Sequence, residues 1–260
     1  MIASPRLVAH TVSVLRDAGC VFAEDEADLL IAHAADDTAL EALVARRTDG
    51  VPLEVILGWT SFCGLRIEID PGVFVPRQRT AFLVEQGVSR TRHGATVVDL
   101  CCGSGAVGRA LAEQVPGVVL HAADLDPVAV ACATRNLGPV GGRAVCGDLF
   151  AALPPELRGT VDVVVVNAPY VPTDEIALMP PEARDHEPRA ALDGGADGVE
   201  IHRRVAVEVG DWLRPGGYVL IETSPGQADL TTTALADAGL ATDLASSDEF
   251  FATVAIGRRV

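Results

Sequence analysis

The tetrapeptide Asn167-Ala168-Pro169-Tyr170 combines residue types that could hold a flat, nitrogen-containing group. The Asn167 side-chain oxygen and the Ala168 carbonyl can accept both N–H bonds of an amide or amine, which would fix its orientation. The Tyr170 ring can stack on such a group, and its π face tolerates a nearby cation. Asn and Pro are also common where a strand runs into a loop. The tetrapeptide therefore indicates function only if a cofactor site adjoins it.

A glycine-containing segment upstream is the candidate for that cofactor site. A short apolar strand contains Asp99, and a helical pattern starts at about Val107. Glycines between a strand and a helix permit backbone turns barred to other residues and let a ligand approach the main chain. A ligand-free βα turn would use the same glycines, and a dinucleotide enzyme fits them equally well. The predicted cofactor-binding residues of this segment are Asp99, Cys101, Cys102, Gly103, Ser104 and Gly105.

Two further strands end in carboxylates, as a nucleoside site requires. Asp124, followed by Leu125, lies about 20 residues beyond the glycines, where a carboxylate can accept the hydroxyls of a ribose. Asp148, followed by Leu149, ends the next strand and could meet the amino group of an adenine. A strand-final Asp can instead cap a helix, a role that Asp126 before a proline suits better.

The elements that position these residues are short apolar strands alternating with helices from about residue 95 onward. Valines fill positions 163–166, a pattern typical of a parallel strand buried on both faces. Strands alternating with helices predict a doubly wound α/β sheet, with ligands outside the carboxyl ends of the strands. The predicted strands cover 96–100, 118–124, 144–148, 161–167, 217–222 and 250–257.

The first part of the chain has a different pattern. Residues 4 to about 48 show helical spacing, beginning with a Ser4 N-cap and a proline at the first helical position. Leu65, Ile67 and Ile69 then alternate with charged residues, as in a half-buried strand. With a turn at Pro71-Gly72, this predicts a β-hairpin. We expect a helical domain (1–58), a hairpin linker (59–80) and a large domain (81–260).

Composition excludes several classes of partner. The formal net charge is −16, and all 20 basic residues are Arg, so the chain would on average repel nucleic acid. The first ten residues show no signal peptide, and no apolar run approaches membrane-spanning length. The six cysteines have no metal-ligand spacing, so no metal is expected. We expect a cytoplasmic monomer whose partner is a protein.

The tetrapeptide is similar to the (Asn/Asp)-Pro-Pro-(Tyr/Phe) motif of amino-methyltransferases. Similarity across nearly the whole chain then identifies it as a member of the peptide-chain release factor glutamine N5-methyltransferases. The segment at 187–205, with its Glu-Pro pair and following glycines, is particularly diagnostic. The matching stretches are 50–80, 97–112, 147–150, 166–172, 187–205 and 213–227.

The resemblance implies a fold, a cofactor and a reaction. It implies a class I methyltransferase domain, Rossmann-like and mostly parallel with an antiparallel C-terminal strand, behind a helical substrate-recognition domain. The cofactor would be S-adenosyl-L-methionine, and the methyl group would pass to the side-chain nitrogen of a glutamine. The protein substrate would be a release factor or another translation-associated protein. Asn167 to Tyr170 would hold the glutamine, and Asn167 would also contact the cofactor. Arg77 is a candidate substrate contact.

Three positions depart from the family pattern. Cys101 replaces the usual first glycine, Leu149 stands where an aromatic residue is common, and Ala168 replaces the first proline of the motif. The constraint that a proline places on its predecessor now acts on Ala168 and no longer on Asn167. Two alternatives stay open. One is a nucleic-acid N-methyltransferase acting on adenine or guanine, and the other is a cofactor-binding homologue of low activity.

Overall fold

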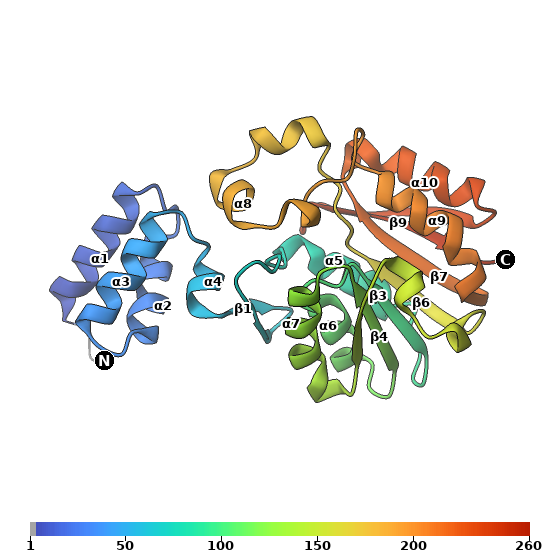
Figure 1. Ribbon diagram of the computed structural model, residues 1–260, viewed down its shortest axis with the longest axis horizontal. Helices are drawn as coiled ribbons and strands as arrows, with labels where there is room; N and C mark the ends of the chain where they lie inside the picture. The colour runs from blue at the N-terminus through green and yellow to red at the C-terminus, as the bar shows by residue number, and fades with distance from the viewer. Residues whose placement is uncertain (1–3) are drawn as a thin grey trace.

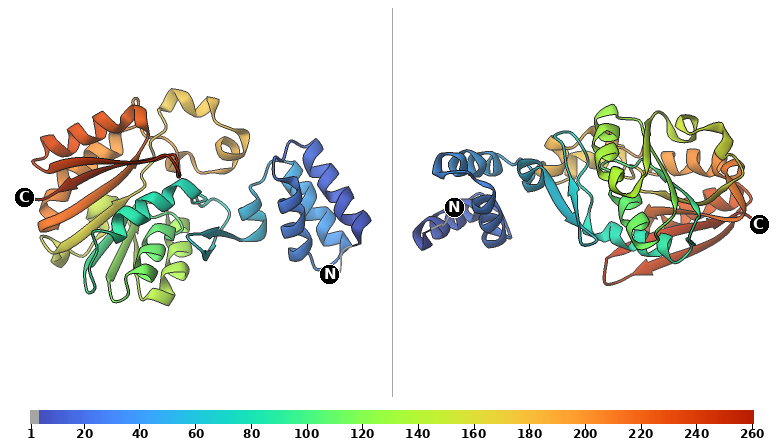
Figure 2. Two further views of the ribbon diagram at one scale, coloured as in Figure 1. Left: turned by 180° about the vertical axis from the view of Figure 1, so that it is seen from behind. Right: turned by 90° about the horizontal axis from the view of Figure 1, so that it is seen from below.

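The N-terminal region is a small helical bundle with its own core. A computed structural model describes residues 4–260, so the first three residues of the predicted helical domain lie outside the described part. Ser4 accepts a hydrogen bond from the Leu7 N–H and caps the first helix, as predicted, and Asp36 caps the third. In Figures 1 and 2 the first three helices stand apart from the sheet. The helices are α1 (Pro5–Asp17), α2 (Ala23–His33), α3 (Asp37–Thr48) and the short α4 (Leu53–Leu57).

A two-stranded hairpin connects this bundle to the rest of the protein. Strands β1 (Trp59–Phe62) and β2 (Leu65–Glu68) are antiparallel. The turn between them is Cys63-Gly64, with φ of 49° and 75°, the backbone that two-residue hairpin loops favour. Pro71-Gly72 does form a turn, in which the Val73 N–H donates to the Asp70 carbonyl at 3.1 Å, but the prediction that this turn closes the hairpin was wrong. That pair follows the hairpin, and the sequence drew attention to it because Pro-Gly is a strong turn signal.

The large sheet has seven strands in the order β5-β4-β3-β6-β7-β9-β8. The five strands from β5 to β7 are parallel, whereas β9 is antiparallel to β7 and β8 to β9. The predicted class I architecture with an antiparallel C-terminal strand is confirmed. The strands are β3 (Thr96–Leu100), β4 (Val119–Asp124), β5 (Arg143–Cys146), β6 (Val161–Val166), β7 (Leu213–Thr223), β8 (Ala241–Ser247) and β9 (Ala252–Arg258).

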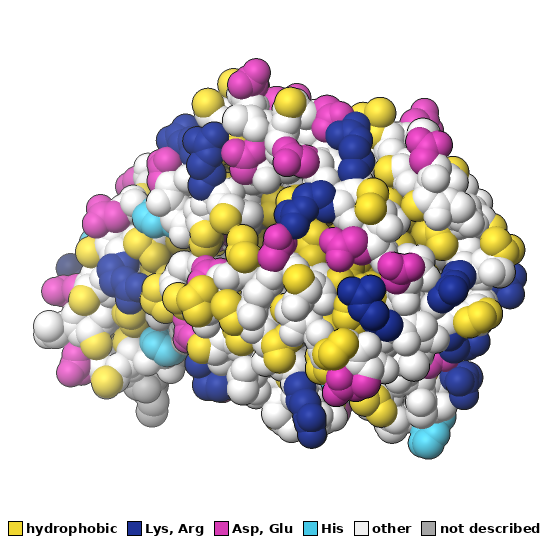
Figure 3. Space-filling model, turned by 45° about the vertical axis from the view of Figure 1, so that its right-hand side comes forward, with side chains coloured by type: hydrophobic (Ala, Val, Ile, Leu, Met, Phe, Trp, Pro, Cys, Tyr) yellow, Lys and Arg dark blue, Asp and Glu magenta, His cyan; other side chains and the backbone are white. Residues whose placement is uncertain are grey.

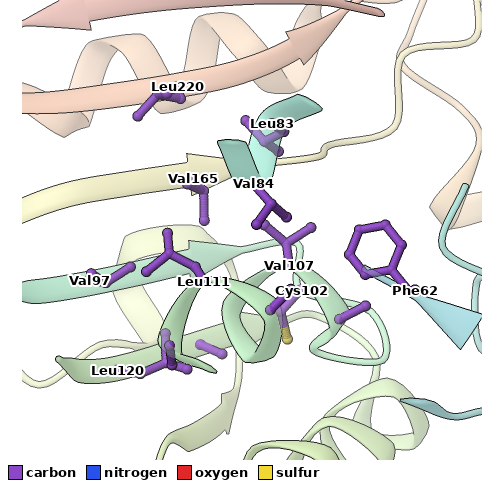
Figure 4. Packing of buried hydrophobic residues seen from close by; sticks show 14 of the residues in the cluster. Phe62, Leu83, Val84, Val97, Cys102, Val107, Leu111, Leu120, Val165 and Leu220 are labelled. Carbon is purple, nitrogen blue, oxygen red and sulfur yellow. The ribbon is translucent and has the colours of Figure 1, made fainter. Parts of the chain in front are cut away.

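Alternate residues of the central strands feed two cores on opposite faces of the sheet. On β6, Val163 and Val165 join the core beneath α5 and α6, whereas Val164 and Val166 join the core beneath α9. In Figure 4, Val97, Val165 and Leu220 come from three adjacent strands and lie in the core that Leu111 and Val107 of α6 also fill. The helices are α5 (Ala81–Val88), α6 (Ala106–Gln114), α7 (Pro127–Leu137), α8 (Pro181–His186), α9 (Glu200–Trp212) and α10 (Ala228–Asp237).

The hairpin packs onto the same core as the sheet. Phe62 of β1 is fully buried in the cluster that contains Val107 and Cys102 (Figure 4). On the other side of the hairpin, the Glu68 N–H donates to Asn136 of α7 at 2.9 Å. These contacts fix the hairpin, and with it the residues that follow, against the carboxyl edge of the sheet. Among the described residues, no helix is long and apolar enough to cross a membrane.

Candidate active site

The two sequence motifs meet at the point where the strand order of the sheet reverses. β3 and β6 are neighbours, and their last residues, Leu100 and Val166, are register partners. The chain leaves both strands at the same level, which is where doubly wound sheets bind ligands. A cavity of about 470 Å³ opens there. All the predicted site residues line it except Gly105, and the wall also includes Phe74, Arg79, Thr80, Met179, Leu192 and Arg204.

The loop after β3 is shaped by three left-handed positions at alternate residues. Cys101, Gly103 and Gly105 have φ of 54°, 54° and 76°. A cysteine stands in the first of them, although glycine adopts this backbone at lower cost. Gly105 faces away from the cavity, because a Cβ there would come within 3.2 Å of the Ala133 Cβ on α7. We therefore assign Gly105 to packing of the loop, and expect no contact between it and the cofactor.

Asp124 fixes the loop through hydrogen bonds to the backbone. One of its carboxylate oxygens accepts the Gly103 N–H at 2.8 Å, and the other accepts the Asp126 N–H at 3.0 Å. Asp126 in turn caps α7 through the Val128 N–H, as the sequence predicted. Each Asp124 oxygen retains an acceptor position after these bonds, so the side chain can still receive ribose hydroxyls. Burial raises the pKa of Asp124, and the two backbone bonds oppose that shift.

Asp99 is the most deeply buried carboxyl group of the cavity wall. It accepts the Gly108 N–H at 2.8 Å and so ties the first turn of α6 to β3. A Cβ at Gly108 would lie 2.9 Å from the Asp99 carboxylate, which explains why glycine is needed there. Burial raises the pKa of Asp99 to about 7. Its main visible role is to fasten the cofactor loop.

The thiols of the loop are poor nucleophiles. Burial raises the pKa of both Cys101 and Cys102 well above the usual range, and the carboxylates of Asp99 and Asp124 add to the effect. Because the thiolate is the reactive form, neutral thiols at these positions favour packing over chemistry. All six cysteines of the chain are free.

The cavity wall contains an ion pair that the sequence did not predict. Arg204 of α9 donates to Asp148 at 2.6 Å. Asp148 thus faces the cavity with one oxygen already engaged. The adjacent Leu149 is buried, with a left-handed φ of 46°. An apolar side chain lies there in place of a stacking aromatic ring, so adenine would contact Leu149 through dispersion alone.

Asn167 is oriented by a buried threonine. Its Nδ2 donates to the Thr80 hydroxyl at 3.4 Å, and Thr80 is fully buried at the start of α5. Because the amide nitrogen is used in this bond, the Asn167 side-chain oxygen is left as an acceptor for a ligand. Neighbouring Ala168 is buried, and its carbonyl is the second acceptor of the motif.

Tyr170 is held by a charged pair on its hydroxyl side. Arg79 donates to the Tyr170 hydroxyl at 2.6 Å, and that hydroxyl donates to Glu222 at 3.4 Å. The Arg79 guanidinium also pairs with Glu222 at 3.5 Å and lies 5.9 Å from the Tyr170 ring centroid. Burial raises the pKa of both Tyr170 and Glu222. These contacts fix the ring at the cavity wall.

The glycines of the 187–205 segment allow it to pack directly on the backbone of Tyr170. A Cβ at Gly198 would lie 2.3 Å from the Tyr170 carbonyl oxygen, and one at Gly194 would lie 2.7 Å from its Cα. Gln227 donates to the same Tyr170 carbonyl at 2.8 Å and to the Asp197 carbonyl at 3.0 Å. The 187–205 segment therefore supports the backbone of the Asn167–Tyr170 motif.

Arg77 lies in the cavity wall, but its guanidinium has a protein partner. It donates to Glu187 at 2.6 Å and lies 4.8 Å from the Phe74 ring centroid. Glu187 is buried, and its other oxygen accepts the Val75 N–H at 3.4 Å. Arg77 thus joins the loop after the hairpin to the 187–205 segment, which favours a structural contact over a substrate contact.

Arg79, Thr80, Arg204 and Glu222 were missed by the sequence reasoning. Thr80 closely follows the predicted site residue Arg77 in the sequence, and this proximity was the available signal. Glu222 ends a buried apolar strand, where a lone carboxylate is unusual and could have been singled out. Arg204 and Arg79 had no signal, since each is one Arg among many on an amphipathic surface.

Comparison with known proteins agrees with this geometry. The methyltransferase small domain family matches residues 64–179. A release factor glutamine methyltransferase from Geobacter sulfurreducens is 40% identical over 193 residues, covering 74% of this chain and 67% of the relative. One from Mycolicibacterium smegmatis is 36% identical over 250 residues, covering 94% of this chain and 86% of the relative. The chain belongs to the release factor glutamine methyltransferase family.

Membership of the release factor glutamine methyltransferase family confirms three predictions made from the sequence. The protein is a methyltransferase, its cofactor is S-adenosyl-L-methionine, and its family is the one identified from the motifs. A methyltransferase from Pyrococcus furiosus has the same fold, with a TM-score of 0.58 at 19% identity over 75% of this chain and 89% of that one. This likeness bears on the fold alone.

Proposed function

We propose that the enzyme transfers a methyl group to the side-chain amide nitrogen of a glutamine in a peptide chain release factor. The observation that carries the proposal is the orientation of Asn167 by Thr80. The Asn167 side-chain oxygen is left free to accept hydrogen bonds, and both Asn167 and Ala168 line the cavity that the cofactor loop also lines. Two acceptors side by side match the two N–H bonds of a primary amide. The names of the relatives support glutamine as the bearer of that amide.

The cavity residues would act mainly by binding and alignment. When bound, S-adenosyl-L-methionine supplies a methyl group activated by a positive sulfonium. Asp124 would hold its ribose, and Asp148 and Leu149 its adenine. Asn167 and Ala168 would accept the amide hydrogens, and Tyr170 would pack on the amide plane. In this orientation the nitrogen can attack the methyl carbon in line with the departing sulfur, and holding two reactants in such geometry accelerates reactions strongly.

A strong base is not required in this scheme. The nitrogen–carbon bond forms as the carbon–sulfur bond breaks, the electron pair stays on sulfur, and the amide nitrogen then loses its proton to solvent. The contacts of two buried carboxyl groups beside the site, Glu222 and Asp99, agree with a reaction that needs no strong base. Glu222 is buried behind Tyr170, and Asp99 is bonded to Gly108, so both are better placed to fix the site than to remove a proton.

We propose the division of labour that the sequence predicted, with residues 1–58 recognising the substrate protein, 59–80 linking, and 81–260 carrying the reaction. The separate hydrophobic core of the helical bundle supports it. A contact between the bundle and the large domain adds to that support, because Arg47 of α3 pairs with Glu182 of α8 at 3.5 Å. In Figure 1, α8 lies between the bundle and the large domain.

We further propose that the enzyme works as a monomer in the cytoplasm. All six thiols are free, which suits a reducing compartment. A nucleic-acid substrate is less well supported. On the face seen in Figure 3, arginines stand singly or in small groups among carboxylates and form no continuous basic stripe.

The test is transfer of labelled methyl from S-adenosyl-L-methionine to purified release factor. We expect label on one glutamine, and loss of transfer when that glutamine is replaced by glutamate. Asn167→Ala should retain cofactor binding and lose most of the methyl transfer. Asn136→Ala is not used as its control, because Asn136 ties the hairpin to α7 and its loss would disturb the fold. Asn167→Asp is the better second variant. Label on RNA or on other extract components, with none on release factor, would contradict the proposal.

A further inference from the structure

A second cavity, of about 620 Å³, lies beside the first one, and we call it the side groove. It is formed where the turn of the β1–β2 hairpin, the start and middle of α5, the end of α6 and the β8–β9 turn come together. The tip of the β8–β9 hairpin lies beside α5 (Figure 2), and Phe250 from that tip stacks on Phe82 of α5 with ring centroids 6.2 Å apart. The groove is therefore a fixed part of the fold.

One short segment forms the wall between the side groove and the cofactor cavity. In the helical turn at Gln78–Thr80, Thr80 lines the cofactor cavity and Gln78 lines the side groove. Arg79 lines both. Arg79 also donates to the Tyr170 hydroxyl. The two cavities therefore adjoin at the substrate half of the site, by which we mean the part formed by Asn167 to Tyr170. When the glutamine of a bound polypeptide lies at Asn167, the residues next to that glutamine can reach the side groove.

The chemistry of the side groove is acidic and aromatic. Glu85 and Glu249 are exposed carboxylates in its wall, and Asp248 precedes Glu249 in the sequence. The one cation among its lining residues is Arg79, whose charge is balanced by Glu222. Phe251 also lines the groove, 86% exposed and with a left-handed φ of 51°. A large apolar ring displayed to solvent on a turn is typical of a contact surface.

We infer that the side groove binds a basic segment of the substrate protein, carrying lysine or arginine and an apolar side chain, next to the methylated glutamine. This inference rests on the proposed function and names the substrate feature that the same site would recognise. Two features of the groove favour this occupant. The groove adjoins the substrate half of the active site at Arg79, and its unbalanced charges are negative.

The experiment compares two short peptides that each carry one glutamine, flanked in one by lysines and a leucine and in the other by glutamates and a leucine. The double variant Glu85→Gln/Glu249→Gln removes both carboxylates, and Phe251→Ala removes the ring. The control is Asp211→Asn/Asp237→Asn, which removes two exposed carboxylates that line neither cavity. Methyl transfer gives KM and kcat, and fluorescence anisotropy gives the binding of each peptide without any reaction.

We expect wild type and control to prefer the lysine peptide, with a preference that weakens as salt is added. The double variant should raise KM for that peptide about tenfold, and should bind both peptides equally. Phe251→Ala should weaken the binding of both peptides, because both carry the leucine. Equal KM for the lysine peptide in the double variant and the control would overturn the inference. If no peptide or protein glutamine is methylated, the proposed function fails, and anisotropy alone still decides whether the groove binds the lysine peptide.

Discussion

Arg77 and Glu187 are 110 residues apart in the chain and form an ion pair of 2.6 Å at the edge of the active-site cavity. The pair joins the loop after the hairpin to the segment that braces Tyr170. These are also two of the stretches by which the family resemblance was identified. These two family segments therefore help to assemble the wall of the site through their contact with each other.

Removing Arg77 should destabilise the protein more than neutralising Glu187 does. Arg77→Ala leaves a buried carboxylate without its cation, whereas Glu187→Gln keeps the side-chain volume and removes the charge. We expect Arg77→Ala to lower the free energy of unfolding by about 2–3 kcal/mol and Glu187→Gln by about 1 kcal/mol. Urea unfolding at neutral pH measures both. Equal effects, or a more stable Arg77→Ala, would show that the pair is not structural.

Thr80→Val should slow methyl transfer without weakening cofactor binding. Valine fills the same buried space and removes the hydroxyl that orients Asn167. The amide of Asn167 can then rotate, so we expect kcat to fall about tenfold, because misaligned reactants lose much of the advantage of proximity. Calorimetry with S-adenosyl-L-methionine should give an unchanged Kd. Thr232→Val, which removes a hydroxyl bonded to the Ala228 carbonyl on α10, is the matched control. An unchanged kcat in Thr80→Val would remove Thr80 from the account.

Ala168→Pro should raise the rate. Proline at this position restricts Asn167 to extended backbone, and it reduces the freedom that binding of the substrate must overcome. Among the described residues, the Ala168 N–H donates to no backbone carbonyl outside the regular strands, so the substitution breaks no such bond. We expect kcat to rise about threefold and stability by about 0.5 kcal/mol. A rate below that of wild type would mean that alanine suits this chain's own substrate.

The alternation of strands with helices and the position of the site could be predicted from the sequence, because both depend on local patterns. The valine run of β6 and the strand-final Asp124 were placed correctly by periodicity and spacing. Strand β8 was missed because it is an edge strand and largely exposed, so its sequence lacks an apolar alternation. The hairpin turn was misplaced because Cys63-Gly64 is a weaker turn signal than Pro71-Gly72.

The residues that orient the motif could not be predicted, for a physical reason. Thr80 and Glu222 act on Asn167 and Tyr170 from 87 and 52 residues away in the chain. Such contacts depend on how the strands are ordered and on where the hairpin packs, and neither is encoded in a local pattern. The ion pair of Arg204 with Asp148 was hidden for the same reason.

The stability of the protein should carry a pH signature from Asp99. Burial raises the pKa of this carboxyl to about 7 in the folded chain, so the native state binds the proton more tightly than the unfolded chain does. Its contribution to stability is complete below the unfolded pKa and is lost as the pH rises through 7. Asp99→Asn keeps an acceptor for the Gly108 N–H and has no proton to lose.

The free energy of unfolding of Asp99→Asn, minus that of wild type, should therefore rise between about pH 4 and about pH 7 and level off above that, by an amount on the order of a few kcal/mol in total. Denaturant unfolding of both proteins across this range gives the difference, in which the titration of all other groups cancels. A difference that stays constant with pH would contradict the buried, raised-pKa assignment.

The most direct test of the central claim is the chemical identity of the methylated nitrogen. Release factor labelled with S-adenosyl-L-methionine carrying an isotopic methyl group is digested, and the labelled peptide is hydrolysed in strong acid. A methylated glutamine amide breaks down to glutamate and labelled methylamine, whereas a methylated lysine, arginine or main-chain nitrogen keeps its label on the amino acid. We predict that the label is recovered as methylamine and that it maps to a single glutamine. Label retained on any other amino acid would contradict amide methylation at Asn167-Ala168-Pro169-Tyr170.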